Sequence, residues 1–250
     1  MRPLRTTAPY LLERLAGGVL RTAHRGAPRL APDNTLEAVR AATAFPVDFV
    51  EVDVHLTADG HLLLWHDDAL ITPGGLFPIR EHSLAELRAL GLPDGTLATL
   101  PEAVETVRGH CGLMIDLKAP DLHSAVERDV RAAGFDDVLV CGGFADSLAY
   151  LEAALPNVAV SLTPDGAEYR DLAGVLTRQP HLDALTVYWR VVGPRLMNAA
   201  REVGALVLAW TVDHPHIADH VLAQGVHGLT SNNHELLTSL RAERAGSGVG

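Results

Sequence analysis

The chain has 250 residues, of which 48% are hydrophobic, and its 20 basic and 31 acidic residues give a formal net charge of -11. The hydrophobic fraction is ample for a folded core. The acidic balance argues against general binding to nucleic acid or to an anionic membrane surface, since both need basic patches. This length suits one large domain or two small ones.

No apolar run reaches the roughly 18 residues that a membrane span requires. Glu13 and Arg14 interrupt the apolar stretch that an N-terminal signal peptide would need. We therefore expect no stable insertion into a membrane and a cytoplasmic location. Cys111 and Cys141 each lie in or beside a strand-like run, and we expect both to be reduced core residues.

A short helix is predicted around Ala8–Ala16. After it, eight strand-like runs alternate strictly with eight helix-like stretches. The strands are predicted at Gly18–Ala23, Asp48–His55, Leu113–Leu117, Val138–Cys141, Val158–Leu162, Ala184–Trp189, Leu206–Val212 and Gly228–Ser231. The helices are predicted at Thr35–Ala44, Pro101–Arg108, Asp121–Ala133, Ala145–Leu155, Ala167–Arg178, Pro194–Val203, Pro215–Ala223 and His234–Arg244.

Several strand runs are apolar with little alternation, which is typical of a parallel sheet covered on both faces. Prolines at early helix positions and glycines soon after helix ends mark the boundaries. Eight βα units in a chain of this length predict the α/β class and a single TIM (β/α)8 barrel. A doubly wound open sheet is the alternative, and the short chain favours closure.

The alternation breaks once, between His66 and Cys111, where the link contains Pro73-Gly74-Gly75 and a predicted helix at Leu84–Leu90. We interpret this link as a short insertion after the second strand. The prediction is therefore one domain over residues 1–245, followed by a glycine-rich, disordered tail at 246–250.

Acidic residues alternate with apolar ones in the second predicted strand. Side chains along a strand point to opposite faces with a period of two, so Glu51 and Asp53 share one face. Two neighbouring carboxylates resist burial unless a positive charge lies between them. A divalent cation is the simplest candidate.

The active sites of TIM barrels lie at the C-terminal ends of the strands. The polar or aromatic residues predicted there are His24, Arg25, Glu51, Asp53, His66, Asp116, Lys118, Trp210, Thr230 and Ser231. We interpret Thr230 and Ser231 as local hydrogen-bonding groups. Trp210 either fills the barrel or packs against substrate, as aromatic residues in pockets often do.

The carboxylates of Glu51, Asp53 and Asp116 suit one hard cation, Mg²⁺ or Ca²⁺, with Mn²⁺ as a third candidate. Zinc would be expected to recruit histidine or cysteine. His24 and His66 are then free for proton transfer. Together with the cationic side chains of Arg25 and Lys118, these groups describe a site for an anionic tetrahedral group such as phosphate.

Several motifs taken together resemble the glycerophosphodiester phosphodiesterase family, a group of phospholipase C-like TIM barrels. They are His24-Arg25-Gly26, Pro32-Asp33-Asn34-Thr35, Glu51-Val52-Asp53-Val54, Thr57-Ala58-Asp59-Gly60, His66-Asp67, Leu100-Pro101-Glu102-Ala103-Val104, Ile115-Asp116-Leu117-Lys118 and Ala209-Trp210-Thr211-Val212. The resemblance spans nearly the whole chain.

The resemblance implies metal-dependent hydrolysis of glycerophosphodiesters to glycerol 3-phosphate and an alcohol. It further implies that His24 and His66 act as general acid and base. The implied metal ligands are Glu51, Asp53 and Asp116, and the implied substrate-binding residues are Arg25 and Lys118, with Trp210 as a further candidate.

The sequence also departs from the family's usual pattern. Asp116 stands where the third metal ligand is usually Glu, although related barrels that cleave choline-bearing sphingolipids or lysolipids carry Asp in a comparable place. Asp33 replaces a usual Glu, and Asp213 stands where Asn is common. Asn232 follows Thr230-Ser231 where the family usually places Asp after Thr.

Three functions remain open at this point. The first is the hydrolase, with a small-molecule phosphodiester as its substrate. The second is a phospholipase D-like enzyme that acts on a lysolipid or sphingolipid headgroup. The third is a non-catalytic barrel that only binds a phosphorylated ligand, because barrels host many chemistries. The sequence assigns neither the alcohol nor the oligomeric state.

Overall fold

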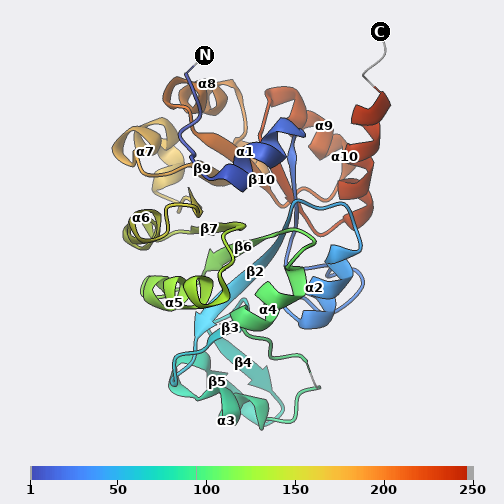
Figure 1. Ribbon diagram of the computed structural model, residues 1–250, viewed down its shortest axis with the longest axis vertical. Coiled ribbons are helices and arrows are strands. Elements are labelled where there is room, and N and C mark those ends of the chain that lie inside the picture. The colour runs from blue at the N-terminus through green and yellow to red at the C-terminus, as the bar shows by residue number, and fades with distance from the viewer. Residues whose placement is uncertain (1, 94, 247–250) are drawn as a thin grey trace.

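A closed barrel of parallel strands forms the centre of the molecule (Figure 1). The computed structural model describes residues 2–93 and 95–246. Within them, the barrel strands are β1 (Leu20–Ala23), β2 (Phe49–Leu56), β6 (Gly112–Leu117), β7 (Val138–Gly142), β8 (Ala159–Leu162), β9 (Ala184–Tyr188), β10 (Leu206–Trp210) and β11 (Gly228–Ser231). Because β1 pairs in parallel with both β2 and β11, the sheet is closed. The TIM-barrel prediction is confirmed, and the open-sheet alternative is wrong.

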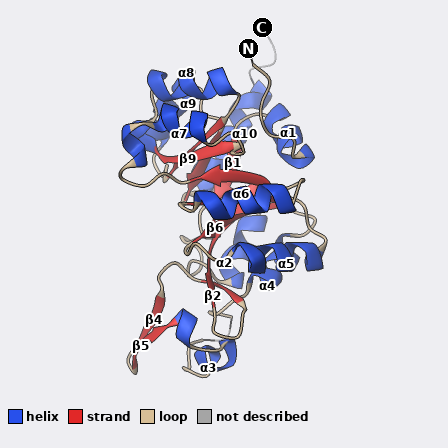
Figure 2. Cartoon of the chain, turned by 90° about the vertical axis from the view of Figure 1, so that its left-hand side faces the viewer, coloured by secondary structure: helices blue, strands red, loops and turns tan. Residues whose placement is uncertain are grey.

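Helices surround the barrel (Figure 2). They are α2 (Leu36–Thr43), α4 (Leu100–Val107), α5 (His123–Ala133), α6 (Ala145–Ala154), α7 (Leu172–Arg178), α8 (Pro194–Val203), α9 (Pro215–Gln224) and α10 (His234–Gly246). Pro194 and Pro215 occupy first-turn positions, as predicted. The predicted start of α7 at Ala167 is wrong, because Glu168–Arg170 forms a 3-10 turn and the Asp171 side chain caps the helix through the Gly174 N–H.

Alternate residues of each strand divide between two apolar layers. Val50 and Val52 point outward and pack with the layer beneath the helices. Phe49 and Met114 point into the barrel. Both cysteines are buried and free, as predicted.

The N-terminal end of the barrel is closed by α1 (Pro9–Ala16). Tyr10 meets the Phe49 ring edge-on at 6.0 Å, and its hydroxyl donates to the Val138 carbonyl and accepts from the Ala159 N–H. The lower interior is thus apolar and sealed. The polar inward-facing residues of β2 and β6 therefore gather at the opposite, C-terminal end.

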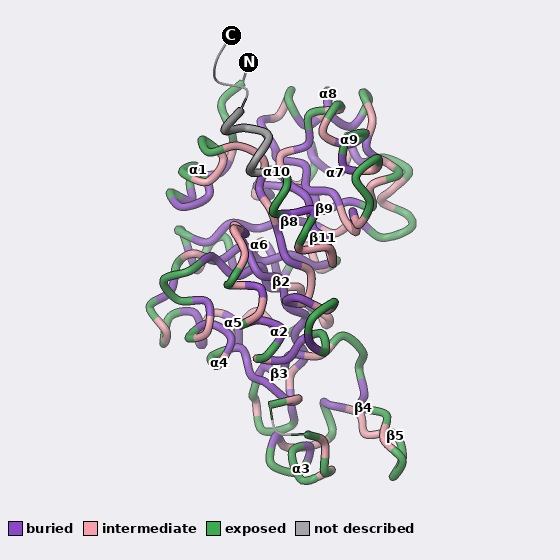
Figure 3. The backbone as a smooth tube through the Cα atoms, turned by 90° about the vertical axis from the view of Figure 1, so that its right-hand side faces the viewer, coloured by how far each residue is buried: buried purple, intermediate pink, exposed green. Residues whose placement is uncertain are grey.

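The insertion after β2 lies at the end of the molecule farthest from α1 (Figures 1 and 3). It contains β3 (Leu62–Leu64), which extends β2 in antiparallel fashion, the hairpin of β4 (Ala69–Thr72) and β5 (Gly75–Pro78), the 3-10 turn Ile79–Glu81, and α3 (Leu84–Arg88). The sequence predicted the insertion and its helix but none of these three strands. The insertion has a small core of its own, which comprises Leu63, Leu70, Ile79, Leu84, Leu87 and Leu97.

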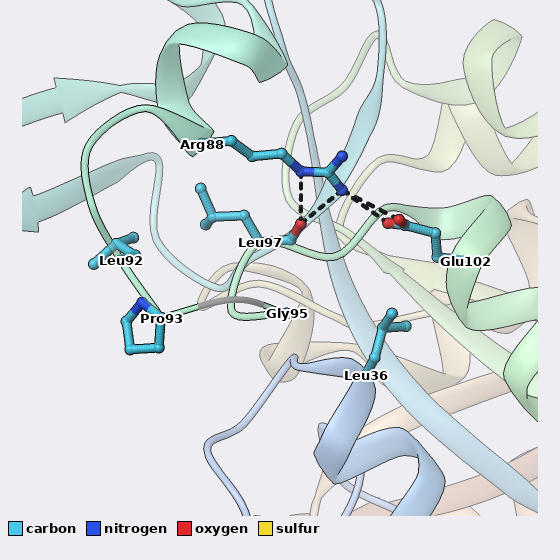
Figure 4. Close-up of a pocket in the computed structure, with 7 residues that line it drawn as sticks. All are labelled: Leu36, Arg88, Leu92, Pro93, Gly95, Leu97 and Glu102. Carbon is cyan, nitrogen blue, oxygen red and sulfur yellow. Dashed lines mark hydrogen bonds and ion pairs between the residues drawn. The ribbon is translucent and has the colours of Figure 1, made fainter.

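An ion pair connects the insertion to the barrel helices (Figure 4). Arg88 of α3 donates to the Leu97 carbonyl at 3.0 Å and pairs with Glu102 of α4, also at 3.0 Å. Glu102 in turn accepts from the Thr99 N–H and forms the capping box of α4. No helix in the part of the chain that the structure describes is long and apolar enough to cross a membrane. Of the predicted tail at 246–250, Gly246 is the last residue of α10, so the prediction is wrong there, and residues 247–250 lie outside the described residues.

Candidate active site

A cavity of about 270 Å³ opens at the C-terminal ends of the barrel strands. Its walls contain every candidate residue from the sequence except Asp53 and Ser231. They are His24, Arg25, Glu51, His66, Asp116, Lys118, Trp210 and Thr230, together with Met114, Cys141, Thr163, Thr186 and Thr211. Asp53 lies just behind this wall and is 1% exposed.

Three carboxylates meet at the floor of the cavity. Glu51 and Asp53 point inward from β2, and Asp116 lies on β6 directly opposite Asp53 in the strand register. One oxygen from each side chain lies within 4.8 Å of the other two. A parallel neighbour strand places its matching side chain about 5 Å away. The period-two pattern of one strand and the register of two strands therefore produce the cluster.

Cationic groups already surround these carboxylates. The Lys118 ammonium lies 2.8 Å from Asp53 Oδ1 and 2.6 Å from Asp116 Oδ2. Arg25 Nε lies 3.0 Å from Asp53 Oδ2, and the Arg25 backbone N–H donates to Glu51 Oε2 at 2.8 Å. Lys118 thus bridges two strands, while Arg25 holds both acidic residues of β2.

The backbone of the loop after β1 is shaped for these contacts. Arg25 adopts a left-handed conformation with φ 52°, which is uncommon for residues other than glycine. Gly26 follows with φ 86°, and a Cβ there would lie 2.6 Å from the Ala38 carbonyl carbon. Only glycine fits this turn, which explains the third residue of the His-Arg-Gly motif.

Asn34 is a site residue to which the sequence analysis gave no role. Its Nδ2 donates to Asp53 Oδ2 at 2.8 Å, and its Oδ1 accepts from the Asp53 backbone N–H at 3.0 Å. It also has a left-handed backbone, with φ 56°, a conformation that asparagine tolerates better than most residues. Its place between Asp33 and Thr35 in the quoted motif was the available signal.

The three carboxyl groups differ in their pKa values because their neighbours differ. Burial raises the pKa of Glu51 well above its usual range, and the charges of Asp53 and Asp116 raise it further. Burial also raises the pKa of Asp116, although Lys118 partly offsets the effect. At Asp53, burial is outweighed by Lys118 and Arg25, which hold its pKa below the usual value. With all three carboxyl groups ionised, the cluster would carry more negative charge than Lys118 and Arg25 neutralise.

These residues fit a divalent cation. Three hard oxygen donors converge within the separation that one ion can bridge. A bound cation would favour the ionised form of Glu51, which burial and its acidic neighbours disfavour. Within the described residues this is the one group of at least three acidic, histidine or cysteine ligands that meets the distance criterion.

The two histidines lie at different depths in the cavity wall. His24 Nε2 is 3.9 Å from Glu51 Oε2, and burial lowers the pKa of the imidazole. The His66 side chain is 45% exposed, and its Nδ1 lies 2.7 Å from Asp67 Oδ1. His55, which the sequence analysis left without a role, contacts the His66 carbonyl through Nε2 at 3.2 Å and supports that loop.

Trp210 forms an aromatic part of the wall. Its indole Nε1 donates to the Thr186 carbonyl at 3.3 Å, and its ring lies 5.8 Å from the Tyr188 ring. The hydrogen bond fixes the indole and leaves its face as an apolar surface beside the charged floor.

Another pocket, of about 260 Å³, lies where the insertion meets the barrel (Figure 4). Its charged residues, Arg88 and Glu102, bind each other, and the guanidinium also binds the Leu97 carbonyl. They are therefore engaged in holding α3 against α4. The three converging carboxylates of the barrel cavity have no counterpart among these lining residues.

Comparison with known proteins identifies relatives of the whole barrel. The model of the Glycerophosphoryl diester phosphodiesterase family matches residues 24–236. A glycerophosphodiester phosphodiesterase of Caldanaerobacter subterraneus is 24% identical over 234 residues, which cover 87% of this chain and 96% of the relative.

Solved structures share the fold. A glycerophosphodiester phosphodiesterase from Thermotoga maritima superposes with a TM-score of 0.77 at 23% identity and covers 89% of this chain and 98% of its own. A phosphodiesterase from Oleispira antarctica, solved in complex with sn-glycerol-3-phosphate, gives a TM-score of 0.75 at 24% identity, with 90% and 96% covered.

Proposed function

The chain belongs to the glycerophosphoryl diester phosphodiesterase family, and from this premise we propose that it hydrolyses glycerophosphodiesters to glycerol 3-phosphate and an alcohol. The observation that carries the proposal is the convergence of His24 and His66 on one cavity that also contains the carboxylate cluster and two cationic side chains. Hydrolysis of a phosphodiester would use all of these groups.

Glu51, Asp53 and Asp116 would hold one divalent cation, Mg²⁺, Ca²⁺ or Mn²⁺. When bound, such an ion polarises the phosphoryl oxygens and stabilises the charge that develops on them. Arg25 and Lys118 add donors for the phosphate, and a planar guanidinium suits two of its oxygens together. The phosphodiester would therefore lie over the carboxylate cluster with its anionic oxygens toward positive groups.

His24 and His66 would move the protons. One imidazole takes a proton from the attacking group, and the other gives a proton to the leaving alkoxide oxygen. The attacking group is either water, which gives glycerol 3-phosphate directly, or the neighbouring hydroxyl of the glycerol, in which case water then opens the cyclic phosphate. The lowered pKa of His24 favours a neutral ring in the free enzyme. Asp67, whose Oδ1 lies 2.7 Å from His66 Nδ1, orients the exposed ring. Trp210 would pack against the glycerol or alcohol group.

Release of glycerol 3-phosphate from glycerophosphocholine, with added cation and with chelator, tests the proposal. We expect turnover with Mg²⁺, Ca²⁺ or Mn²⁺ and none in chelator. His66→Ala is expected to lower kcat by about 10²- to 10⁴-fold. His220→Ala on the exposed face of α9 is the matched control and should leave it unchanged. Absence of release with all three cations would contradict the proposal.

A lysolipid or sphingolipid headgroup is a second candidate substrate, and one observation favours it. Ile71 and Leu76 are paired across the β4–β5 hairpin and are 77% and 63% exposed, so the insertion presents an apolar edge to solvent. Activity on micellar lysophosphatidylcholine with a cyclic phosphate product would support this candidate.

The cytoplasmic location stays a prediction from the sequence, which cell fractionation tests.

A further inference from the structure

Two side chains behind the cavity wall form a hydrogen-bonded chain that ends on His24. Asp213 follows β10, and Asn232 follows β11. Asn232 donates to Asp213 twice, from its backbone N–H to Oδ1 and from Nδ2 to Oδ2, both at 2.8 Å. On the other side, Asn232 Oδ1 lies 2.8 Å from His24 Nδ1. Asp213 and Asn232 are absent from the residues that line the cavity.

The order of donors and acceptors in this hydrogen-bonded series follows from Asp213. A carboxylate only accepts hydrogen bonds, and Asp213 Oδ1 already accepts from the Ser231 hydroxyl as well. The NH₂ group of Asn232 must therefore face Asp213. Its carbonyl oxygen then faces His24 and can only accept, so the shared proton belongs to His24 Nδ1.

The tautomer of His24 has a direct consequence for the cavity. With the proton on Nδ1, the neutral ring has its lone pair on Nε2. This nitrogen lies 3.9 Å from Glu51 Oε2, beyond hydrogen-bond distance. The ring is thus held by one nitrogen while the other is free to exchange a proton.

We propose that Asp213 and Asn232 are positioning residues that fix His24 in the Nδ1–H tautomer and direct Nε2 toward the scissile phosphodiester. Asp213 sets the orientation of the Asn232 amide, and Asn232 sets the tautomer and the tilt of the imidazole. The tautomer assignment stands on these contacts alone. Only its kinetic consequence rests on the proposed function.

The first test reads the tautomer itself by ¹⁵N NMR of histidine-labelled protein in chelator, at a pH where imidazole rings are neutral. His24→Gln identifies the signals of His24. We expect Nδ1 to be protonated in the native chain and the preference to be lost in Asn232→Leu. The exchanged pair, Asp213→Asn with Asn232→Asp, keeps an acceptor beside Nδ1 and should restore the tautomer.

A matched control comes from the neighbouring residue. Asn233 donates from Nδ2 to the Asp213 carbonyl at 3.1 Å and makes no hydrogen bond to His24. Asn233→Ala should keep the native tautomer. A proton on Nε2 in the native chain, or an unchanged tautomer in Asn232→Leu, would overturn the proposal. If Asn232→Leu does not fold, the exchanged pair still decides, because a loss of the Nδ1–H tautomer there contradicts it.

The second test measures steady-state kinetics on glycerophosphocholine. Asn232→Leu should lower kcat by about 10- to 100-fold, the usual effect of removing a partner that orients an active-site histidine. KM should change little, because Asn232 does not line the cavity. The exchanged pair should recover most of kcat. A native kcat in Asn232→Leu would refute the positioning role, whereas an inactive native enzyme would refute the proposed function and leave the NMR result standing.

Discussion

Replacing Lys118 with methionine removes the ammonium that lies between two buried carboxylates. Lys118 is the only lysine in the sequence, and its Nζ contacts Asp53 at 2.8 Å and Asp116 at 2.6 Å. Methionine has a similar length and no charge. The substitution therefore tests the charge of the side chain more than its packing.

The expected cost follows from what remains around each carboxylate. Removing one partner of a buried ion pair typically costs about 3–5 kcal/mol. Asp53 keeps Arg25 and Asn34, while Asp116 loses its one ion-pair partner among the described residues. Since the Lys118 side chain is 21% exposed, we expect the lower end, about 3 kcal/mol of unfolding free energy at neutral pH in chelator.

The loss of unfolding free energy in Lys118→Met should be smaller at low pH than at neutral pH. Burial already raises the pKa of Asp116, and without Lys118 it rises further. A carboxyl whose folded pKa exceeds its unfolded value contributes stability at low pH, and the contribution is lost as pH rises through the folded pKa. The lowered pKa of Asp53 stabilises the native chain at pH values above the ordinary pKa range of aspartate. Without Lys118, this pKa moves back toward its usual value. Both effects make the deficit of the variant shrink as pH falls toward 4.

A divalent cation bound by the three carboxylates should raise the unfolding free energy of the variant above its value in chelator. At about 100 times its Kd, a ligand that binds only the folded state adds about 2.7 kcal/mol. Urea denaturation in chelator and in Mg²⁺, at neutral and acidic pH, measures all three expectations. The control is Arg131→Met, which breaks an exposed pair with Glu127 and should leave the unfolding free energy nearly unchanged. Native stability of Lys118→Met at neutral pH in chelator would refute the reasoning.

Three further outcomes follow from single side chains. His24→Ala should abolish most glycerophosphocholine turnover while circular dichroism stays native, because it removes an imidazole that transfers a proton. A residual kcat above one-tenth would argue against proton transfer. Burial raises the pKa of Asp183 to about 6, so the contribution of this carboxyl to stability is complete below the unfolded pKa and is lost as pH rises through about 6. Asp183→Asn should therefore remove roughly 3 kcal/mol from the pH dependence of the unfolding free energy measured by urea titration. An unchanged pH profile would contradict this expectation. Arg5 donates to the carbonyls of Leu176 and Val203 at the ends of α7 and α8, so Arg5→Ala should lower the unfolding free energy by about 1–3 kcal/mol and leave kcat intact in the folded fraction.

The barrel was predictable because its strands and helices are marked locally. Apolar runs without alternation identified strands such as β7, and Pro194 and Pro215 marked helix starts. The presence of eight βα units in a chain of this length then predicted that the sheet closes into a barrel. The structure confirms it through the pairing of β1 with β11.

The insertion was less predictable because its strands lack the usual signals. β3 has three consecutive leucines with no alternation, and the hairpin leaves Ile71 and Leu76 exposed. A short apolar run is ambiguous between strand and helix. Pairing with β2 and a small separate core decide the outcome here.

At the candidate site, the sequence indicated the acidic, basic and histidine side chains that line the cavity but not the residues that hold them. A period of two placed Glu51 and Asp53 on one face, and this is how they lie. Asn34 and Asn232 act through contacts with residues 19 and 208 positions away. Nothing local in the chain encodes such pairs. The departures at Asp213 and Asn232 were visible in the sequence, yet their hydrogen bond to each other required the folded barrel.

Anomalous diffraction from crystals soaked in Mn²⁺ tests most directly whether the three carboxylates bind a cation. We predict one strong peak bounded by oxygens of Glu51, Asp53 and Asp116 at about 2.0–2.6 Å, and loss of this peak in Asp116→Asn. A well-occupied Mn²⁺ elsewhere with no density among these carboxylates would contradict the account.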